Sequence, residues 1–191
     1  TREGALARQA ARWVAEFEAR RRADGRSIHV EIKGSAEFQV NGRPFTLTAK
    51  SDRIEVAPDG SADILDFKTG SAPSLKEVNA GFSPQLTLTA AILMAGGFEE
   101  LRTARPGALT YVQVTGRDPA GKEEVRGEAD ESEAMAAQAL EGLQRLRVEV
   151  VPLAHIYHSS RPASPSWRRG PWPRNANCLP PASPPSPPRG C

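Results

Sequence analysis

The amino-acid sequence predicts an α/β protein in which a mixed central sheet is flanked by helices. Segments with helical periodicity alternate with β-rich runs, and Asn-Gly and Asp-Gly turn signals separate the first three of these runs. The predicted elements are, in order, a helix over 5–23, strands over 28–40, 43–57 and 62–68, a helix over 83–95, a strand over 108–115 and a helix from 130 to about 147.

The first helix is predicted from an amphipathic pattern that ends at Asp24-Gly25. Its last turn contains Arg20, Arg21 and Arg22, where positive charges complement the helix dipole. We expect these arginines to be solvated, with contact to phosphate as the less favoured alternative. The apolar stripe of this helix comprises Leu6, Trp13, Val14 and Phe17.

Two turn signals order the three strands that follow. Asn41-Gly42 is typical of a two-residue hairpin, and Pro58-Asp59-Gly60 marks a second turn. The second hairpin pairs residues whose numbers sum to about 119. Asp52 and Asp66 sum to nearly this value, so they lie opposite one another to within about one residue.

The two later helices follow the same reasoning. Gly96-Gly97 ends the helix over 83–95. Asp130 and Glu133 resemble a capping box that opens the last helix. The residues expected in the core from these two helices are Leu86, Leu88, Ile92, Leu93, Met135, Leu140, Leu143 and Leu146.

The second hairpin gathers groups suited to phosphodiester chemistry. Asp66 and Lys68 are two residues apart on one strand, so their side chains share a face, while Phe67 points to the other face. Two carboxylates about 5 Å apart repel one another unless a cation lies between them. Asp52, Asp66 and Lys68 therefore favour a divalent-metal site, although acids and lysines on a hairpin are more often a solvated surface.

Three separated segments carry a resemblance to a known family. They are residues 51–55 (SDRIE), 66–70 (DFKTG) and, at the start of the following helix, 84–86 (PQL). In that order they resemble the RecB-type branch of the PD-(D/E)XK nucleases. The resemblance covers about residues 10–147 and looks most like the C-terminal nuclease domain of the AddB proteins of bacterial double-strand-break repair.

The resemblance implies a restriction-endonuclease-like fold and a set of residue roles. Asp52 and Asp66 become metal ligands, with the Phe67 carbonyl as a third, and the ion is Mg²⁺ with Mn²⁺ as an alternative. Lys68 becomes the catalytic lysine and Gln85 the glutamine that organises the site. The implied activity is exonucleolytic cleavage of DNA, delivered as single-stranded ends by a helicase–nuclease partner of the AddA type in the bacterial cytoplasm.

Two features depart from the family pattern. Many relatives have Tyr four residues after the glutamine, where this chain has Thr89. An upstream G-x-x-x-H motif has no counterpart before Asp52, because His29 lies in a predicted strand. We therefore expect residues 1–151 to be a partial nuclease domain, incomplete at its N-terminus.

Composition limits the partners. Residues 1–151 hold 20 basic and 23 acidic side chains, a net charge of −3, so they lack a broad basic surface for duplex DNA. The sequence has no apolar run long enough for a membrane span, no signal peptide and no Walker loop, so neither membrane association nor NTP hydrolysis is expected.

The segment 152–191 has a different composition. It contains 11 of the 17 prolines, together with Ser and Arg, and we expect it to be disordered. The abrupt change raises the hypothesis that this tail is frameshifted or otherwise non-native. Both cysteines, Cys178 and Cys191, lie in it and do not form the closely spaced trio of some AddB-type domains, so an iron–sulfur cluster is not supported.

Two alternatives to a nuclease remain open at this level. The first is a catalytically inactive nuclease-like scaffold that binds DNA or a helicase partner, which the incomplete motifs and the acidic composition favour. The second is a metal-free β domain that binds sugar or lipid, in which Asp52 and Asp66 would not be paired.

Overall fold

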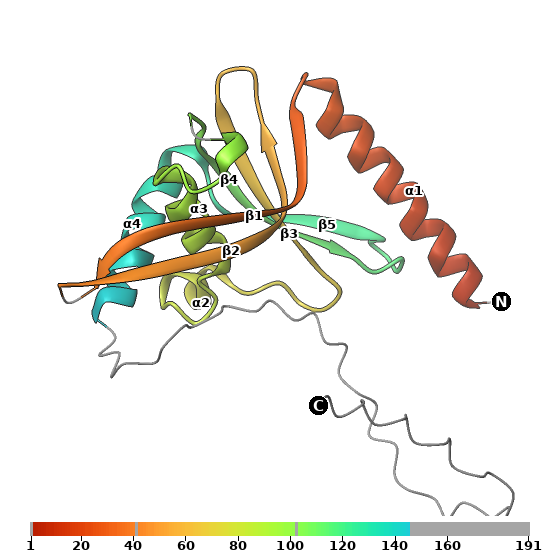
Figure 1. Cartoon of the computed structure of the whole chain (residues 1–191). Helices are drawn as coiled ribbons and strands as arrows, with labels where there is room; N and C mark the ends of the chain where they lie inside the picture. Colours follow the sequence, from red (N-terminus) through yellow and green to blue (C-terminus); the bar gives the residue numbers. More distant parts are fainter. Residues whose placement is uncertain (1, 41, 102, 146–191) are drawn as a thin grey trace, which may run out of the picture. The chain divides into compact units, whose positions relative to one another are not determined.

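The computed structural model describes residues 2–40, 42–101 and 103–145 (Figure 1). The predicted division into residues 1–151 and 152–191 and the predicted disorder of the tail concern a boundary and a segment outside these residues. Leu146, expected in the core, also lies outside them. Five strands form the sheet: β1 (Ser27–Val40), β2 (Arg43–Val56), β3 (Ser61–Lys68), β4 (Arg105–Val114) and β5 (Gly121–Gly127).

The sheet is mixed, as predicted. Its strand order is β1-β2-β3-β4-β5, with β3 and β4 parallel and the other neighbouring pairs antiparallel. The chain passes from β3 to β4 through two helices and a short 3₁₀ turn, as parallel neighbours require a long connection. The helices are α1 (Arg2–Ala23), α2 (Leu75–Asn79), α3 (Gln85–Met94) and α4 (Ala129–Arg145), and the 3₁₀ turn spans Glu99–Leu101.

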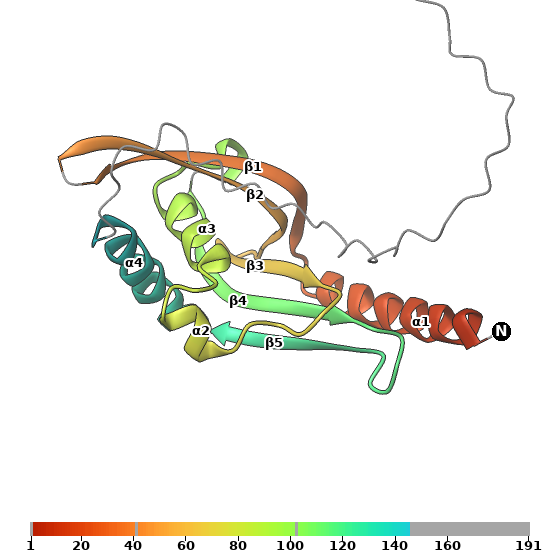
Figure 2. The same cartoon turned by 90° about the horizontal axis from the view of Figure 1, so that it is seen from below.

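The main core lies between the sheet and the pair α3 and α4, which lie side by side (Figures 1 and 2). Every residue of α3 from Leu86 to Leu93 is buried, so this helix is apolar on all sides and central. Ile54, Ile64, Leu109 and Tyr111 complete the core from β2, β3 and β4. The four leucines and isoleucines predicted for the core from α3 are confirmed, and Met135 and Leu143 of α4 pack against it.

A smaller core forms where α1 meets the other face of the sheet. Phe17 is buried against Leu65 and Val112, with Trp13 beside them. The ring of Trp13 lies so close to Gly121 that a Cβ there would come within 2.5 Å of it, so β5 needs glycine at this contact. Val14, predicted on the buried stripe, is instead 37% exposed, because the stripe of α1 that meets the sheet is narrow.

Two elements were absent from the sequence prediction. The helix α2 has only five residues, although Ser74 and Glu77 form a complete capping box that signals its start. The strand β5 (GKEEVRG) lies at the edge of the sheet and pairs with β4. Edge strands often carry charged side chains, which oppose pairing with other chains, and β5 therefore lacks the apolar alternation by which a strand is predicted.

The predicted capping box at the start of the last helix was wrong. The helix begins at Ala129, before Asp130, and the backbone N–H of Glu128 donates to the Glu131 carboxylate at 3.4 Å. The acidic cap therefore lies two residues earlier than predicted. Several acidic residues occur together here, and sequence spacing alone did not identify which of them caps the helix.

Candidate active site

The register of β2 and β3 brings the two aspartates toward each other. Arg53 pairs with Leu65 and Val56 with Ala62 in an antiparallel ladder. Continuing this ladder by one residue places Asp52 opposite Asp66, as predicted. Asp52 shares a face with Ile54, and Asp66 shares a face with Ile64, so both carboxylates lie on the side of the sheet that faces α3.

Asp66, Lys68 and Gln85 are in direct contact. The Lys68 Nζ lies 2.7 Å from Asp66 Oδ2 and donates to Gln85 Oε1 at 3.2 Å. The Gln85 Nε2 donates a short hydrogen bond to Asp66 Oδ1. Each side chain of this triangle is thus bonded to both of the others, which fixes the orientation of the amide and of the carboxylate.

Asp66 and Lys68 differ in how far their side chains are buried. Asp66 is 2% exposed, whereas the Lys68 side chain keeps 22% of its surface accessible. Gln85 is the first residue of α3, so the Asp66 carboxylate lies at the positive end of that helix. The arrangement holds a buried carboxylate in place beside a lysine whose side chain stays partly exposed.

Asp52 joins this group through the backbone. Its Oδ2 accepts a hydrogen bond of 3.0 Å from the N–H of Phe67, the residue between Asp66 and Lys68. The Phe67 side chain points to the other face of the sheet, where its ring packs nearly perpendicular to the Phe17 ring, with the two centroids 6.3 Å apart. The alternation predicted for residues 66–68 is confirmed, while a ligand role for the Phe67 carbonyl stays a prediction.

Thr89 lies one turn after Gln85 on α3. Its hydroxyl donates a 2.8 Å hydrogen bond to the backbone carbonyl of Gln85, and the residue is 4% exposed. The position where many relatives have a tyrosine therefore contributes a bond within the helix and no side chain that reaches toward Lys68.

Sequence reasoning missed Tyr111, which lies directly beside the triangle. Tyr111 pairs with Asp66 in the parallel β3–β4 register and is 1% exposed. The Lys68 Nζ lies 5.7 Å from the centroid of its ring, within the range of a cation–π interaction. The alternating pattern of residues 108–115 predicted a strand there, but no local signal showed that this strand would lie beside the Asp66 strand.

The opposite face of β2 and β3 carries a buried network of charges. Arg53 and Glu55 alternate with the core residues of β2, and the Arg53 Nε donates to Glu55 Oε1 at 2.6 Å. Glu55 is fully buried, and burial raises its pKa above the usual range, against the opposing effect of the nearby arginines. The other members come from α1, the loop after it and β3: Glu18, Arg21, Arg26 and Asp63.

This network corrects the expectation for the end of α1. Arg21 is not solvated: its Nε lies 2.9 Å from Glu55 Oε2 and its Nη1 3.5 Å from Asp63 Oδ2. Arg20 pairs with Glu123 and Arg22 with Glu18, both near the surface. The helical pattern alone could not show this, because the partners come from strands far away in the sequence.

The buried phenol makes stability depend on pH in the alkaline range. Burial and the charge of Asp66 raise the pKa of Tyr111 from 10.0 to about 12. The folded state thus holds the proton more tightly than the unfolded chain, so this contribution is complete below pH 10 and is lost as the pH rises through about 12. When the pH is raised from about 9 to about 11.5, the free energy of unfolding of the wild type should therefore fall by about 2 kcal/mol more than that of Tyr111→Phe. Urea unfolding at the two pH values measures this, and equal losses in both proteins would contradict it.

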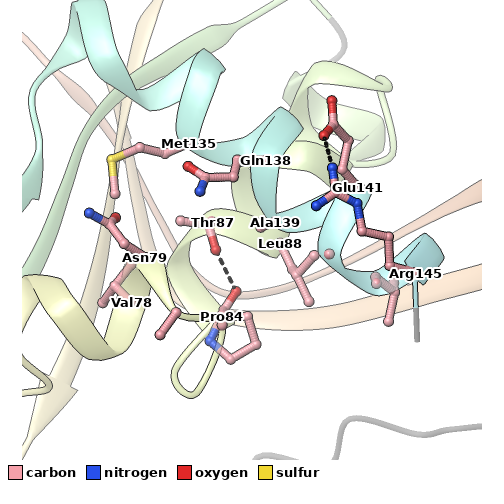
Figure 3. A pocket seen from close by; sticks show the side chains of 14 residues that line it. Val78, Asn79, Pro84, Thr87, Leu88, Met135, Gln138, Ala139, Glu141 and Arg145 are labelled. Atoms are coloured by element: carbon pink, nitrogen blue, oxygen red, sulfur yellow. Dashed lines mark hydrogen bonds and ion pairs between the residues drawn. The ribbon is translucent and has the colours of Figure 1, made fainter.

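A cavity of about 420 Å³ lies elsewhere, among α2, α3 and α4 (Figure 3). Its walls are about equally polar and apolar, and the apolar part includes Val78, Leu88 and Met135. Glu141 and Arg145, which form an ion pair of 3.2 Å, also line it. None of Asp52, Asp66 and Lys68 lines this cavity, so it is separate from the candidate site.

No helix in the described part of the chain is both long and apolar enough to cross a membrane.

The chain is similar to a known protein family and to several known proteins. The model of the PD-(D/E)XK nuclease superfamily matches residues 2–178. An uncharacterized protein of Rickettsia bellii is 29% identical over 116 residues, and one of Rickettsia typhi is 38% identical over 82 residues.

These alignments cover 54% and 43% of this chain but 14% and 10% of the relatives, so the chain spans a small part of the length of each. The crystal structure of SSO0001 aligns with a TM-score of 0.41 and 14% identity, covering 68% of this chain and 55% of that one.

Proposed function

Because this chain belongs to the PD-(D/E)XK nuclease superfamily, we propose that it is a metal-dependent deoxyribonuclease domain that hydrolyses phosphodiester bonds. The observation that carries the proposal is the contact triangle of Asp66, Lys68 and Gln85, with Asp52 bonded to the backbone between the first two. This arrangement places the ammonium of a partly exposed lysine beside carboxylates, a combination suited to phosphate cleavage at a metal site.

The donor set fits Mg²⁺. Asp52, Asp66 and the Phe67 carbonyl are hard oxygen donors, and Mg²⁺ is usually bound by one or two carboxylates while it keeps several waters. Across residues 2–40, 42–101 and 103–145, no three or more His, Cys, Asp or Glu residues are grouped so as to hold a metal, and the candidate site itself contributes two carboxylates. We assign the ion to the two aspartates and the Phe67 carbonyl on the chemistry of these donors, with Mn²⁺ as a substitute.

Each residue then has a distinct role. A bound divalent ion supplies Lewis acidity toward the phosphate and lowers the pKa of an attacking water. Lys68 donates hydrogen bonds through its ammonium and offsets the negative charge that develops on the phosphate oxygens. Gln85 keeps the Asp66 carboxylate and the Lys68 ammonium in fixed orientations, since its amide bonds to both.

The proposed substrate is DNA with single-stranded ends, cut exonucleolytically in double-strand-break repair. Support comes from the resemblance of residues 51–55, 66–70 and 84–86 to AddB-type domains. The net charge of −3 over residues 1–151 favours delivery of the strand by an AddA-type helicase partner in the bacterial cytoplasm. A nuclease domain within a larger enzyme also agrees with the small fraction of the Rickettsia proteins that it matches.

A cleavage assay tests the proposal. End-labelled single-stranded DNA is incubated with the full chain in Mg²⁺, in EDTA, and with Asp66→Asn in Mg²⁺. We expect progressive shortening of the labelled strand in Mg²⁺ and none in the other two reactions. Cleavage that persists in Asp66→Asn would show that another site or a contaminant is responsible.

The alternative is a nuclease-like scaffold that binds DNA or a helicase subunit without cutting. Thr89 favours it, because its hydroxyl bonds to the Gln85 carbonyl where many relatives supply a tyrosine. A scaffold predicts that the wild type retains labelled DNA in a filter-binding assay and leaves it intact in Mg²⁺. The cleavage reaction in Mg²⁺ and the filter-binding assay together therefore distinguish the nuclease from the scaffold.

A further inference from the structure

The loop that follows Lys68 is fastened at two points by side chains of the neighbouring strands. This loop, residues 69–74, joins β3 to α2. Gln113 of β4 donates its Nε2 hydrogen to the Gly70 carbonyl at 2.6 Å. Arg126 of β5 donates its Nε hydrogen to the Pro73 carbonyl at 2.5 Å. Both contacts join the last two strands of the sheet, β4 and the edge strand β5, to the segment that leaves the candidate site.

Arg126 is itself held on several sides. Its Nη2 donates a short hydrogen bond to Glu124, and its Nη1 donates to the Val125 carbonyl at 3.3 Å. Hydrogen bonds from Lys122 and Arg126 hold the pKa of Glu124 below the usual range, so this partner stays ionised at neutral pH. The Arg126 side chain is 12% exposed, so it lies inside the structure and not on an open surface.

Tyr111 connects Arg126 to Lys68. The Arg126 Cζ lies 5.8 Å from the centroid of the Tyr111 ring, and the Lys68 Nζ lies 5.7 Å from the same centroid. Both cations thus lie within cation–π range of the same buried ring, whose face attracts positive charge. A shift of the ring or of the loop would change the position of the Lys68 ammonium relative to Asp66.

We propose that Arg126 is a positioning residue for Lys68: it holds the loop 69–74 through the Pro73 carbonyl and packs on the ring of Tyr111 that supports the ammonium. The catalytic part of this inference rests on the proposed nuclease function. Direct binding of substrate phosphate by Arg126 is disfavoured, because its guanidinium already donates to three protein acceptors and is largely covered.

Three variants of the full chain test this role. Arg126→Ala removes both connections, and Arg126→Lys keeps the charge but cannot reproduce the fork of N–H donors. The matched control is Lys122→Ala, because Lys122 is the other basic partner of Glu124 on β5 and half of its side chain is exposed. The three measurements are amide hydrogen exchange of residues 69–74, the ¹³Cε resonance of Lys68, assigned by its loss in Lys68→Arg, and steady-state cleavage kinetics.

We expect exchange in the loop to accelerate at least 10-fold in Arg126→Ala and the Lys68 resonance to shift as its distance from the Tyr111 ring changes. The value of kcat should fall about 10-fold with little change in KM, since an interaction with the transition state is weakened. Arg126→Lys should show smaller changes in the same direction, and it replaces Arg126→Ala if that variant does not fold. Lys122→Ala should match the wild type.

An unchanged loop exchange rate and an unchanged Lys68 resonance in Arg126→Ala or Arg126→Lys would overturn the proposal. Equal effects in Lys122→Ala would also overturn it, because they would reflect a general loosening of β5. If the wild type does not cleave DNA, the nuclease function fails, while hydrogen exchange and the resonance still decide whether Arg126 positions Lys68.

Discussion

Replacement of Lys68 by alanine is expected to lower kcat for DNA cleavage by about 10²- to 10³-fold, the usual effect of removing one group that stabilises developing charge. Lys68 is the cation of the contact triangle, and its ammonium lies 2.7 Å from Asp66 Oδ2. The variant leaves Gln85 bonded to Asp66, so the carboxylate stays in place. The loss should therefore fall on kcat and leave Mn²⁺ affinity largely unchanged.

Lys50→Ala is the matched control, because Lys50 lies on neighbouring β2 and forms an exposed ion pair of 2.7 Å with Glu31. Single-turnover cleavage of end-labelled single-stranded DNA at saturating Mg²⁺ gives the two rates. A rate for Lys68→Ala within about threefold of the control would exclude a direct role for the ammonium, as would an equal loss in both variants.

Arg53→Met is expected to lower the free energy of unfolding by about 3–5 kcal/mol, the cost of breaking a buried ion pair by removal of one partner. Arg53 is 4% exposed and bonds to both Glu55 and Glu18, and its guanidinium lies 5.5 Å from the centroid of the Phe17 ring. Without it, the fully buried Glu55 keeps Arg21 as a partner but loses its bond to Arg53.

Urea unfolding followed by circular dichroism measures this loss. Arg22→Met is the control, because Arg22 also pairs with Glu18 but is exposed, and surface pairs contribute about 0–1 kcal/mol. A loss below about 1 kcal/mol for Arg53→Met would mean that the buried network does not stabilise the strands that carry Asp52 and Asp66.

Turn signals and helical periodicity predicted much of the fold correctly, whereas the short helix α2 and the cap of α4 were not predicted. The hairpin turns at residues 41–42 and 58–60 fixed the order and register of β1 to β3, and the ladder that includes Arg53 and Leu65 places Asp52 opposite Asp66. The apolar pattern of α3 likewise predicted its buried residues. These features depend on contacts between residues close in the sequence, where turn chemistry and periodicity are decisive.

Several of the features that were missed depend on contacts across the sheet. The strand β5 lacks an apolar row, so periodicity did not reveal it, and Arg126 was missed with it. Tyr111 was predicted to lie in a strand, but its place beside Asp66 follows from the parallel pairing of β3 and β4 through a long connection. Arg21 was expected to be solvated, because the helical pattern does not show its partners. These partners, Glu55 and Asp63, lie on strands far away in the sequence.

The central claim is that Asp52 and Asp66 together bind one divalent ion. The most direct measurement is an anomalous difference map from crystals of the full chain grown with Mn²⁺, with Asp66→Asn crystals as the reference. We predict a peak between the two carboxylates of the wild type, within about 2.0–2.6 Å of their oxygens, and no peak in Asp66→Asn. Wild-type crystals with both carboxylates ordered and no anomalous peak between them would contradict the account.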